Sequence, residues 1–360
     1  IKNFNMKLNK KFLKEYLNSV GPVGFEYELG SQKLWMENIA QYANEVEIDN
    51  YGTAYGVMGN MDSDFKVVIE AHADEISWLV NYIDSKGFIR VIRNGGSDTQ
   101  IAPSMRVNVW GSKGPVSGVF GHPAIHIHDR AKDITLDSIF VDVGASTKEE
   151  VIEMGINVGT VITFTDGLME LGNDFYCGRA LDNRIGGFMI SEVARKLKEN
   201  KIELPFKLYV VNSVQEEIGL RGAQMIAQVI KPNVAIVTDV CHDTSSPCYN
   251  ASKQGDIESG KGGVITRGPA VQNNLRKLIL DTASDKKIPV QLSASSTSTG
   301  TDTDAFAFNG GAVSALISLP LKYMHSTVET CHKDDIKTVI NLIYETLLNI
   351  EENHNFKYSR

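Results

Sequence analysis

The chain is poor in cysteine, which bears on how its fold is stabilised. Its 360 residues include four cysteines, none of them in a CxxC pair: Cys177, Cys241, Cys248 and Cys331. A chain of this length does not need disulfide bonds to hold its fold. We therefore expect free and mostly buried thiols in a reducing compartment.

Long apolar runs are also missing. No segment approaches the about 20 apolar residues that a membrane span requires. The first residues, IKNFNMKLNKKFLKEYL, carry charge and lack the apolar stretch of a secretory signal. These features predict a cytoplasmic protein with no membrane partner.

Basic residues are not in excess, and tryptophan is scarce. Asp and Glu (44) outnumber Lys and Arg (36), which gives a formal net charge of -8. Proteins that bind nucleic acid normally present a basic stripe, so we expect no nucleic-acid partner. With three Trp and no aromatic-rich stretch that would stack sugar rings, the chain is also a poor candidate for a carbohydrate enzyme.

The length and the apolar content of 42% are those of a soluble protein with two domains. Residues 1–75 and 174–360 alternate apolar strands with amphipathic helices, which predicts two parts of one catalytic α/β domain. Residues 76–173 carry short β-branched runs between glycine turns, which predicts an inserted small β-barrel or sandwich. The predicted fold class is α/β, with a largely parallel central sheet flanked by helices.

Periodicity places the elements of the catalytic parts. Helices are expected over residues 8–20, 29–43, 182–200, 220–230, 269–287 and 335–350, the last one capped by Asp335. Strands are expected over residues 46–60, 66–71, 207–213, 234–239, 288–294 and 312–319. In the insertion, residues 148–154 are expected to form a helix capped by Ser146 or Thr147.

Acidic and imidazole side chains recur where apolar runs end. Open α/β sheets bind ligands outside the carboxyl ends of their strands. The residues of this kind are His72, Asp74, Asp182, Glu216, Glu217, Asp239 and His325. A set of two histidines, two aspartates and a glutamate, with one glutamate to spare, suffices to hold two divalent metals that share a carboxylate.

Some of these residues could support the metal ligands, and some could have an ordinary structural role. Asp74 lies two positions after His72, so in an extended chain it points the same way and could hold the imidazole in one tautomer. Asp182 opens a helix, where aspartate is a routine N-cap. Adjacent residues such as Glu216 and Glu217 diverge, so one could face a metal and the other the substrate, although two glutamates also occur in solvated turns.

Two motifs leave alternatives open. Asp239 ends the apolar run VAIVTD, but His242 and Asp243 follow closely and could take its place. The run GHPAIHIH contains His122, His126 and His128 at a spacing that could imitate a metal-binding strand. Because these three lack suitable acidic partners nearby, we interpret them as surface or interface residues.

The motifs HADE, GRALDNRIGG, VNSVQEEIGLRGA, VTDV, STGTDTDAFAF and PLKYMHSTVE resemble those of the M42 family of metallo-aminopeptidases. The likeness runs from SVGPVGFEYEL near the start to the region after His325. The family includes glutamyl, deblocking and tetrahedral aminopeptidases, and some of its members are labelled endoglucanases. The resemblance implies a fold of the di-zinc exopeptidase type.

The resemblance also implies a role for each residue. It makes His72, Asp182, Glu217, Asp239 and His325 the metal ligands, with Asp182 as the bridge. It makes Glu216 the general base and Asp74 an essential orienting carboxylate. Asp302, in TGTDTDAF, is expected to help bind the free amine of the substrate.

Cofactors and assembly follow from the same resemblance. Histidine and carboxylate ligands without thiolate suit two zinc or cobalt ions, or manganese. The partners are short peptides and further copies of the chain. Family members use the domain that corresponds to residues 76–173 to form dimers, which build a hollow dodecamer.

Three alternatives compete with the aminopeptidase interpretation. A different di-metal exopeptidase or deacylase, such as a carboxypeptidase, would use a similar site. An endoglucanase would need two carboxyls about 5–9.5 Å apart across a sugar, which neighbouring glutamates committed to metals do not supply. A non-catalytic scaffold would be expected to lack ligands, and none is missing here.

Overall fold

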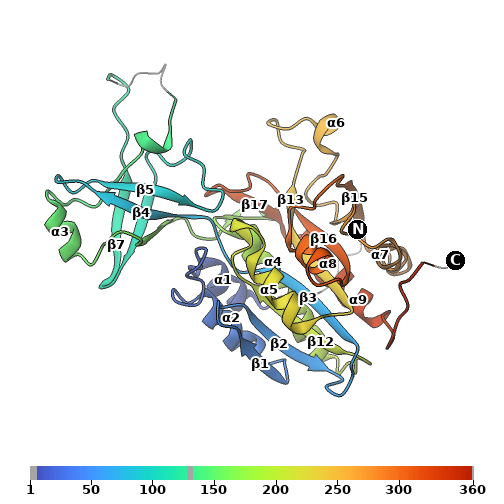
Figure 1. Cartoon of the computed structure of the whole chain (residues 1–360). Helices are drawn as coiled ribbons and strands as arrows, with labels where there is room; N and C mark the ends of the chain where they lie inside the picture. Colours follow the sequence, from blue (N-terminus) through green and yellow to red (C-terminus); the bar gives the residue numbers. More distant parts are fainter. Residues whose placement is uncertain (1–5, 128–132, 359–360) are drawn as a thin grey trace.

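The computed structural model describes residues 6–127 and 133–358 (Figure 1). In this part of the chain, a mixed sheet covered by helices is joined to a closed β-barrel, which projects to one side of it. The protein therefore has an α/β fold with a separate β-rich body, and each body has its own cluster of buried apolar side chains.

The central sheet has eight strands in the described residues, in the order β1-β2-β12-β3-β13-β16-β14-β15. Their bounds are β1 (Glu45–Ile48), β2 (Ala54–Gly59), β3 (Lys66–His72), β12 (Lys207–Ser213), β13 (Val234–His242), β14 (Gly263–Arg267), β15 (Val290–Ala294) and β16 (Val313–Leu321). The centre, β12-β3-β13-β16, is parallel. The near-continuous apolar runs of β3 and β13 are typical of such strands, which are covered on both faces.

Toward its edges the sheet departs from the prediction. β1 pairs with β2, β2 with β12 and β14 with β16 in antiparallel fashion. β15, at the other edge, pairs with β14 in parallel, so the sheet is mixed, with a parallel centre and antiparallel pairs outside it. At the β1 edge, antiparallel pairing suits strands with one solvated face.

Helices cover both faces of the sheet. The helices are α1 (Lys10–Asn18), α2 (Ser31–Ile39), α4 (Leu181–Glu199), α5 (Arg221–Ile230), α7 (Asn273–Lys286), α8 (Asp302–Phe308) and α9 (Lys333–Leu348), with the shorter α3 (Lys148–Glu153) and α6 (Ala251–Gln254). α4 packs on β3 and against α1, α2 and α9, whereas α5 and α8 contact each other elsewhere on the sheet. None of the helices among the described residues combines the length and apolar character that a membrane span requires.

The β-rich body is a closed barrel with strand order β4-β5-β8-β7-β6-β9. Its strands are β4 (Ser77–Ile83), β5 (Ile89–Asn94), β6 (Arg106–Gly111), β7 (Gly114–Phe120), β8 (Val141–Asp142) and β9 (Val161–Phe164). Trp78 and Phe120 meet edge to face at its centre, 5.5 Å between ring centroids. Of the two predicted architectures the barrel is the one present, and Thr147, not Ser146, caps α3.

A small antiparallel sheet was not predicted. It consists of β10 (Met169–Leu171), β11 (Phe175–Gly178) and β17 (Glu329–His332), in the order β10-β11-β17. Its register places Gly178 opposite Glu329. This pairing brings the start of α4, which carries Asp182, next to the loop that follows β16, which carries His325.

One local prediction, the cap of the last helix, was wrong. α9 is capped by His332, whose Nδ1 accepts the N–H of Asp334. Asp335 is instead buried and accepts the backbone N–H groups of Gly260 and Gly262 at 2.6 and 2.8 Å. All four thiols are free, as predicted; Cys177 and Cys331 are buried, Cys241 is partly buried and Cys248 is exposed.

Candidate metal centre

The carboxyl ends of the parallel strands meet at one edge of the sheet, where predicted ligands lie. His72 ends β3 and pairs with Ser213, which ends β12. On the other side of β3, Val237 of β13 pairs with Glu70, so Asp239 reaches the level of His72. The register thus brings Asp239 Oδ1 to 3.6 Å from His72 Nε2.

Asp182 presents its two carboxylate oxygens to two different histidines. Oδ1 lies 3.1 Å from His72 Nε2, and Oδ2 lies 3.3 Å from His325 Nε2. Asp182 is not the N-cap of α4, because that position is Ala180. The carboxylate is therefore placed between the two histidines, as a bridging group would be.

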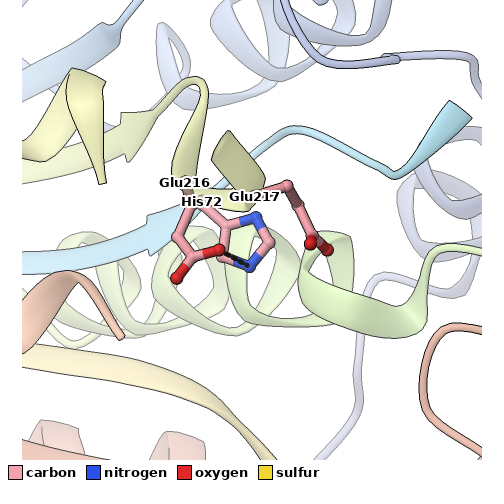
Figure 2. A group of neighbouring side chains, drawn as sticks. All are labelled: His72, Glu216 and Glu217. Carbon is pink, nitrogen blue, oxygen red and sulfur yellow. Dashed lines mark ion pairs between the residues drawn. The ribbon is translucent and has the colours of Figure 1, made fainter. Parts of the chain in front are cut away.

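Glu216 and Glu217 diverge from a short 3₁₀ turn, η2 (Glu216–Ile218), which follows β12. In Figure 2, Glu216 reaches toward His72 while Glu217 points to the other side of the imidazole. Glu216 Oε2 is 3.9 Å from His72 Nε2, and Glu217 Oε2 is 3.3 Å from His325 Nε2. The two neighbours thus serve different parts of the site.

Asp74 holds this turn. Its Oδ1 accepts the backbone N–H of Glu216 at 3.0 Å, and its Oδ2 accepts that of Glu217 at 3.1 Å. Asp74 Oδ1 also lies 3.4 Å from His72 Nδ1, outside the usual range of a hydrogen bond. Sequence reasoning anticipated the contact with the imidazole but not the two backbone amides.

The side chains form overlapping groups that could hold a metal ion. In each group, one ligand atom per residue lies within 4.8 Å of the others: His72, Asp182 and Asp239; Asp182, Glu217 and His325; and His72, Glu216 and Glu217. The first two groups share Asp182. Imidazole nitrogens and carboxylate oxygens without thiolate are donors that zinc, cobalt and manganese accept, so the residues fit a divalent ion.

Burial and close charges shift the pKa values at the site. Burial raises the pKa of Glu217 to about 7 and that of Glu216 to about 10, the latter also through Asp239. Hydrogen bonds to Asp182 and Glu217 raise the pKa of His325 to about 11. Burial opposes ionisation of Asp182, but the two histidines hold its pKa below the usual range. Concentrated acids in a buried site favour a bound cation.

Asp302 lies deeper than the predicted ligands. It is 1% exposed, and its Oδ2 accepts the hydroxyl of Ser213 at 2.7 Å. The same hydroxyl is hydrogen-bonded to Glu70. The carboxyl groups of Asp302 and Glu70 also interact directly, and burial raises the pKa of Asp302 to about 6.

Glu329 is a residue of the candidate site that sequence reasoning missed. It is 2% exposed, and its carboxylate accepts the backbone N–H of Asp182 at 3.0 Å and that of His325 at 2.8 Å. One buried side chain thus holds the backbone on both sides of the second metal group. The only sequence signal was its place at the end of PLKYMHSTVE.

The barrel also borders the site, through two glycines that follow β5. A Cβ at Gly96 would lie 2.6 Å from His325 Nδ1, and one at Gly95 would lie 3.3 Å from Glu217 Cβ. Gly95 has a φ of +83, which side-chain-bearing residues rarely adopt. The insertion therefore contributes a wall to the metal centre, although the predicted ligands lie outside it.

The remaining candidates lie elsewhere. His122 and His126 are exposed, and His128 lies outside the described residues. Asp243 is buried and accepts the backbone N–H groups of Ser245 and Ser259. Neither it nor His242 belongs to a metal-holding group in the described part of the chain.

The fold and the site define a class: an α/β protein with residues that could hold a metal at the carboxyl edge of its sheet. The chain belongs to the M42 peptidase family, because the model of that family, described as M42 glutamyl aminopeptidase, matches residues 52–342. Peptidases of this family are metal-dependent, and the chain is a peptidase of the aminopeptidase type.

Individual relatives agree with this assignment. The chain is 35% identical to a lysyl aminopeptidase of Pyrococcus furiosus over 339 residues, which cover 92% of the chain and 94% of that protein. It is similar to the TET aminopeptidase of a marine sediment Thaumarchaeota archaeon, with a TM-score of 0.90, 29% identity, and coverage of 96% and 97%. It is also similar to the TET1 peptidase of Pyrococcus horikoshii, which can assemble into a tetrahedron or a large octahedral shell (TM-score 0.82, 27% identity, coverage of 93% and 98%).

Proposed function

We propose that the chain removes N-terminal residues from short peptides with two divalent metal ions, zinc or cobalt or else manganese, and with Glu216 as general base. One observation carries this proposal. Asp182 offers its two oxygens to two histidines, and each histidine has a further carboxylate beside it.

The two ions would occupy the two groups that share Asp182. His72, Asp182 and Asp239 would hold one ion, and Asp182, Glu217 and His325 the other. When bound, such ions lower the pKa of a water molecule and polarise the carbonyl of the peptide bond. The protein fixes these ligands through Glu329, which holds the backbone of Asp182 and His325.

Glu216 would move the proton. Its carboxylate lies beside His72 but belongs to neither of the two groups that share Asp182. A base in this position takes a proton from the attacking water and returns it to the leaving amine. Asp74, through the amides of Glu216 and Glu217, keeps this base and the adjacent ligand in fixed relative positions. Asp302, a buried carboxyl group behind the metal groups, would help to bind the free α-amine.

An aminopeptidase must recognise that free amine, so acetylating the N-terminus of a peptide is expected to abolish its hydrolysis. Amidating the C-terminus of the same peptide should leave kcat/KM nearly unchanged. Mass spectrometry of the products from the unmodified, acetylated and amidated peptide compares the two ends. Loss of activity on C-terminal amidation alone would instead indicate a carboxypeptidase, and cleavage of the acetylated peptide would indicate a deacylase.

We further propose that residues 76–173 act as a dimerisation and gating domain, and that residues 1–75 and 174–360 form the catalytic domain. The barrel borders the metal centre at Gly95 and Gly96 and carries exposed apolar side chains, among them Ile125 and Ile127 at 65% and 79%. Apolar surface of this kind is common at protein interfaces. By analogy with a TET1 relative whose structure contains a dodecamer, dimers would assemble into a dodecamer.

The expected mass of the purified protein is that of a large homo-oligomer, because the exposed apolar residues of the barrel would be covered in it. Light scattering at micromolar concentration measures the mass, and activity is assayed on the same sample. Ile127→Ser, on the exposed loop, should lower the mass while leaving the metal ligands untouched. A stable and active single chain would contradict the proposed assembly.

A further inference from the structure

The turn that carries Glu216 and Glu217 is held by two buried carboxyl groups, those of Asp74 and Glu26. Asp74 accepts the N–H groups of Glu216 and Glu217. The preceding amide, that of Gln215, donates to Glu26 Oε1 at 3.2 Å. Three consecutive N–H groups are thus bound by the pair Glu26 and Asp74.

Backbone hydrogen bonds also close the turn, from Gly219 and Leu220 N–H to the carbonyl of Glu216 and from Arg221 N–H to that of Gln215, but both of its ends adopt an uncommon backbone conformation. Gln215 has a φ of 59, and Gly219 and Leu220 on the far side of η2 also have positive φ. A side-chain-bearing residue in this region is uncommon and persists only where its surroundings hold it there. The bond from Gln215 to Glu26 acts at the first of these positions, where the chain leaves β12.

Glu26 is itself rigidly placed. It is 2% exposed, and its own backbone carbonyl accepts the hydroxyl of Ser31 at 3.0 Å and the N–H of Gln32 at 3.1 Å. These bonds tie it to the start of α2, far in sequence from the metal ligands. The N-terminal segment therefore reaches into the metal centre through one side chain.

We propose that Glu26 is a positioning residue for the reaction: by accepting the N–H of Gln215 it sets the direction of the η2 turn, and so places Glu216 as base and Glu217 as ligand. This inference rests on the proposed function for its kinetic consequence. Its structural consequence, the order of the η2 turn, does not depend on it.

To hold the turn, Glu26 must supply an acceptor oxygen at hydrogen-bonding distance from the N–H of Gln215; it need not carry a charge. Burial, and next to it the charge of Asp74, raises the pKa of Glu26 to about 8. This shift favours the uncharged form of the side chain, and glutamine matches both its shape and its acceptor oxygen. Aspartate keeps a carboxyl group but is shorter by one methylene. The distance from its oxygen to the N–H of Gln215, 3.2 Å for glutamate, would then exceed hydrogen-bonding range.

The test compares Glu26→Asp and Glu26→Gln in the full-length, metal-loaded protein. Glu26→Asp should lower kcat by about 10- to 100-fold, because a shift of about 1 Å in a catalytic group has effects of this size. KM should stay within about threefold, since ground-state binding to the metal ligands is retained. Glu26→Gln should stay within about threefold of the wild type in both constants.

Glu192→Asp is the matched control. Glu192 is also buried and also accepts a backbone N–H at 3.2 Å, that of Asn9, and its other bonds go to Arg195, outside the metal centre. Shortening it should lower the melting temperature without lowering kcat. If Glu26 had only a structural role, Glu26→Asp would likewise lower the melting temperature without lowering kcat.

Hydrogen exchange provides a second measurement that needs no activity. Backbone amides of residues 214–218 should exchange faster in Glu26→Asp than in the wild type or Glu26→Gln. If the wild type fails to hydrolyse free-amine peptides, the proposed function fails, while exchange still decides whether Glu26 holds the turn. Unchanged exchange, unchanged kcat despite faster exchange, or equal losses in the Gln and Asp variants would each overturn the inference.

Discussion

Glu216→Gln is expected to lower kcat for peptide hydrolysis by about 10²–10⁴-fold, the usual contribution of a general base. The substitution keeps the size and polarity of the side chain and removes its ability to accept a proton. Glu216 is not in either metal group that shares Asp182, so the metal content and KM should change little. Steady-state kinetics and elemental analysis of the same sample measure both effects.

Glu217→Gln is the matched comparison, because it makes the same chemical change one residue away. Glu217 lies 3.3 Å from His325 Nε2 in the second metal group, so losing its charge should weaken metal affinity first. Part of the activity should return when excess metal is added, which Glu216→Gln should not show. Rescue of Glu216→Gln and not of Glu217→Gln would mean that the two roles are exchanged.

The second large effect is expected at Asp182, where Asp182→Ala should remove both metal ions and all measurable activity. Asp182 is the one residue common to both groups, whereas Asp239 and His325 each belong to one. Asp239→Ala and His325→Ala should therefore each lose one ion. The measurement is the ratio of metal to chain after dialysis against metal-free buffer.

Asp243→Asn serves as the control for this series. Asp243 follows Asp239 closely and is fully buried, but its oxygens accept N–H groups of the loop beyond β13. It should retain both ions. Loss of a single ion in Asp182→Ala would show that the two groups do not share this carboxylate.

The parallel centre of the sheet could be predicted from sequence because its strands are long and strongly apolar. Once these strands are placed side by side, their ends must meet at one edge, which explains why His72 and Asp239 are close. The longer helices were predicted for a similar reason, since they show an amphipathic period. α6 and α8, of four and seven residues, are too short to show one and were not predicted. The barrel was predicted as a β-rich insertion, but the sequence did not distinguish a closed barrel from a sandwich.

The supporting contacts of the site could not be predicted in the same way. Glu329 reaches Asp182 through the pairing of β11 with β17, two four-residue strands from distant parts of the chain. Strands this short carry too few side chains to show a period. The contacts of Asp74 and Glu26 are with backbone amides, which leave no trace in the sequence of the donor. Sequence thus identified candidates for metal binding more readily than the residues that position them.

The central claim is that two ions share Asp182, and native mass spectrometry of the metal-loaded wild type tests it most directly. The account predicts two ions per chain, and one ion per chain in His325→Ala under the same conditions. Chelation should remove both ions and the activity together, and added zinc or cobalt should restore them. A wild-type protein that is fully active with one ion per chain, or with none, would contradict the account.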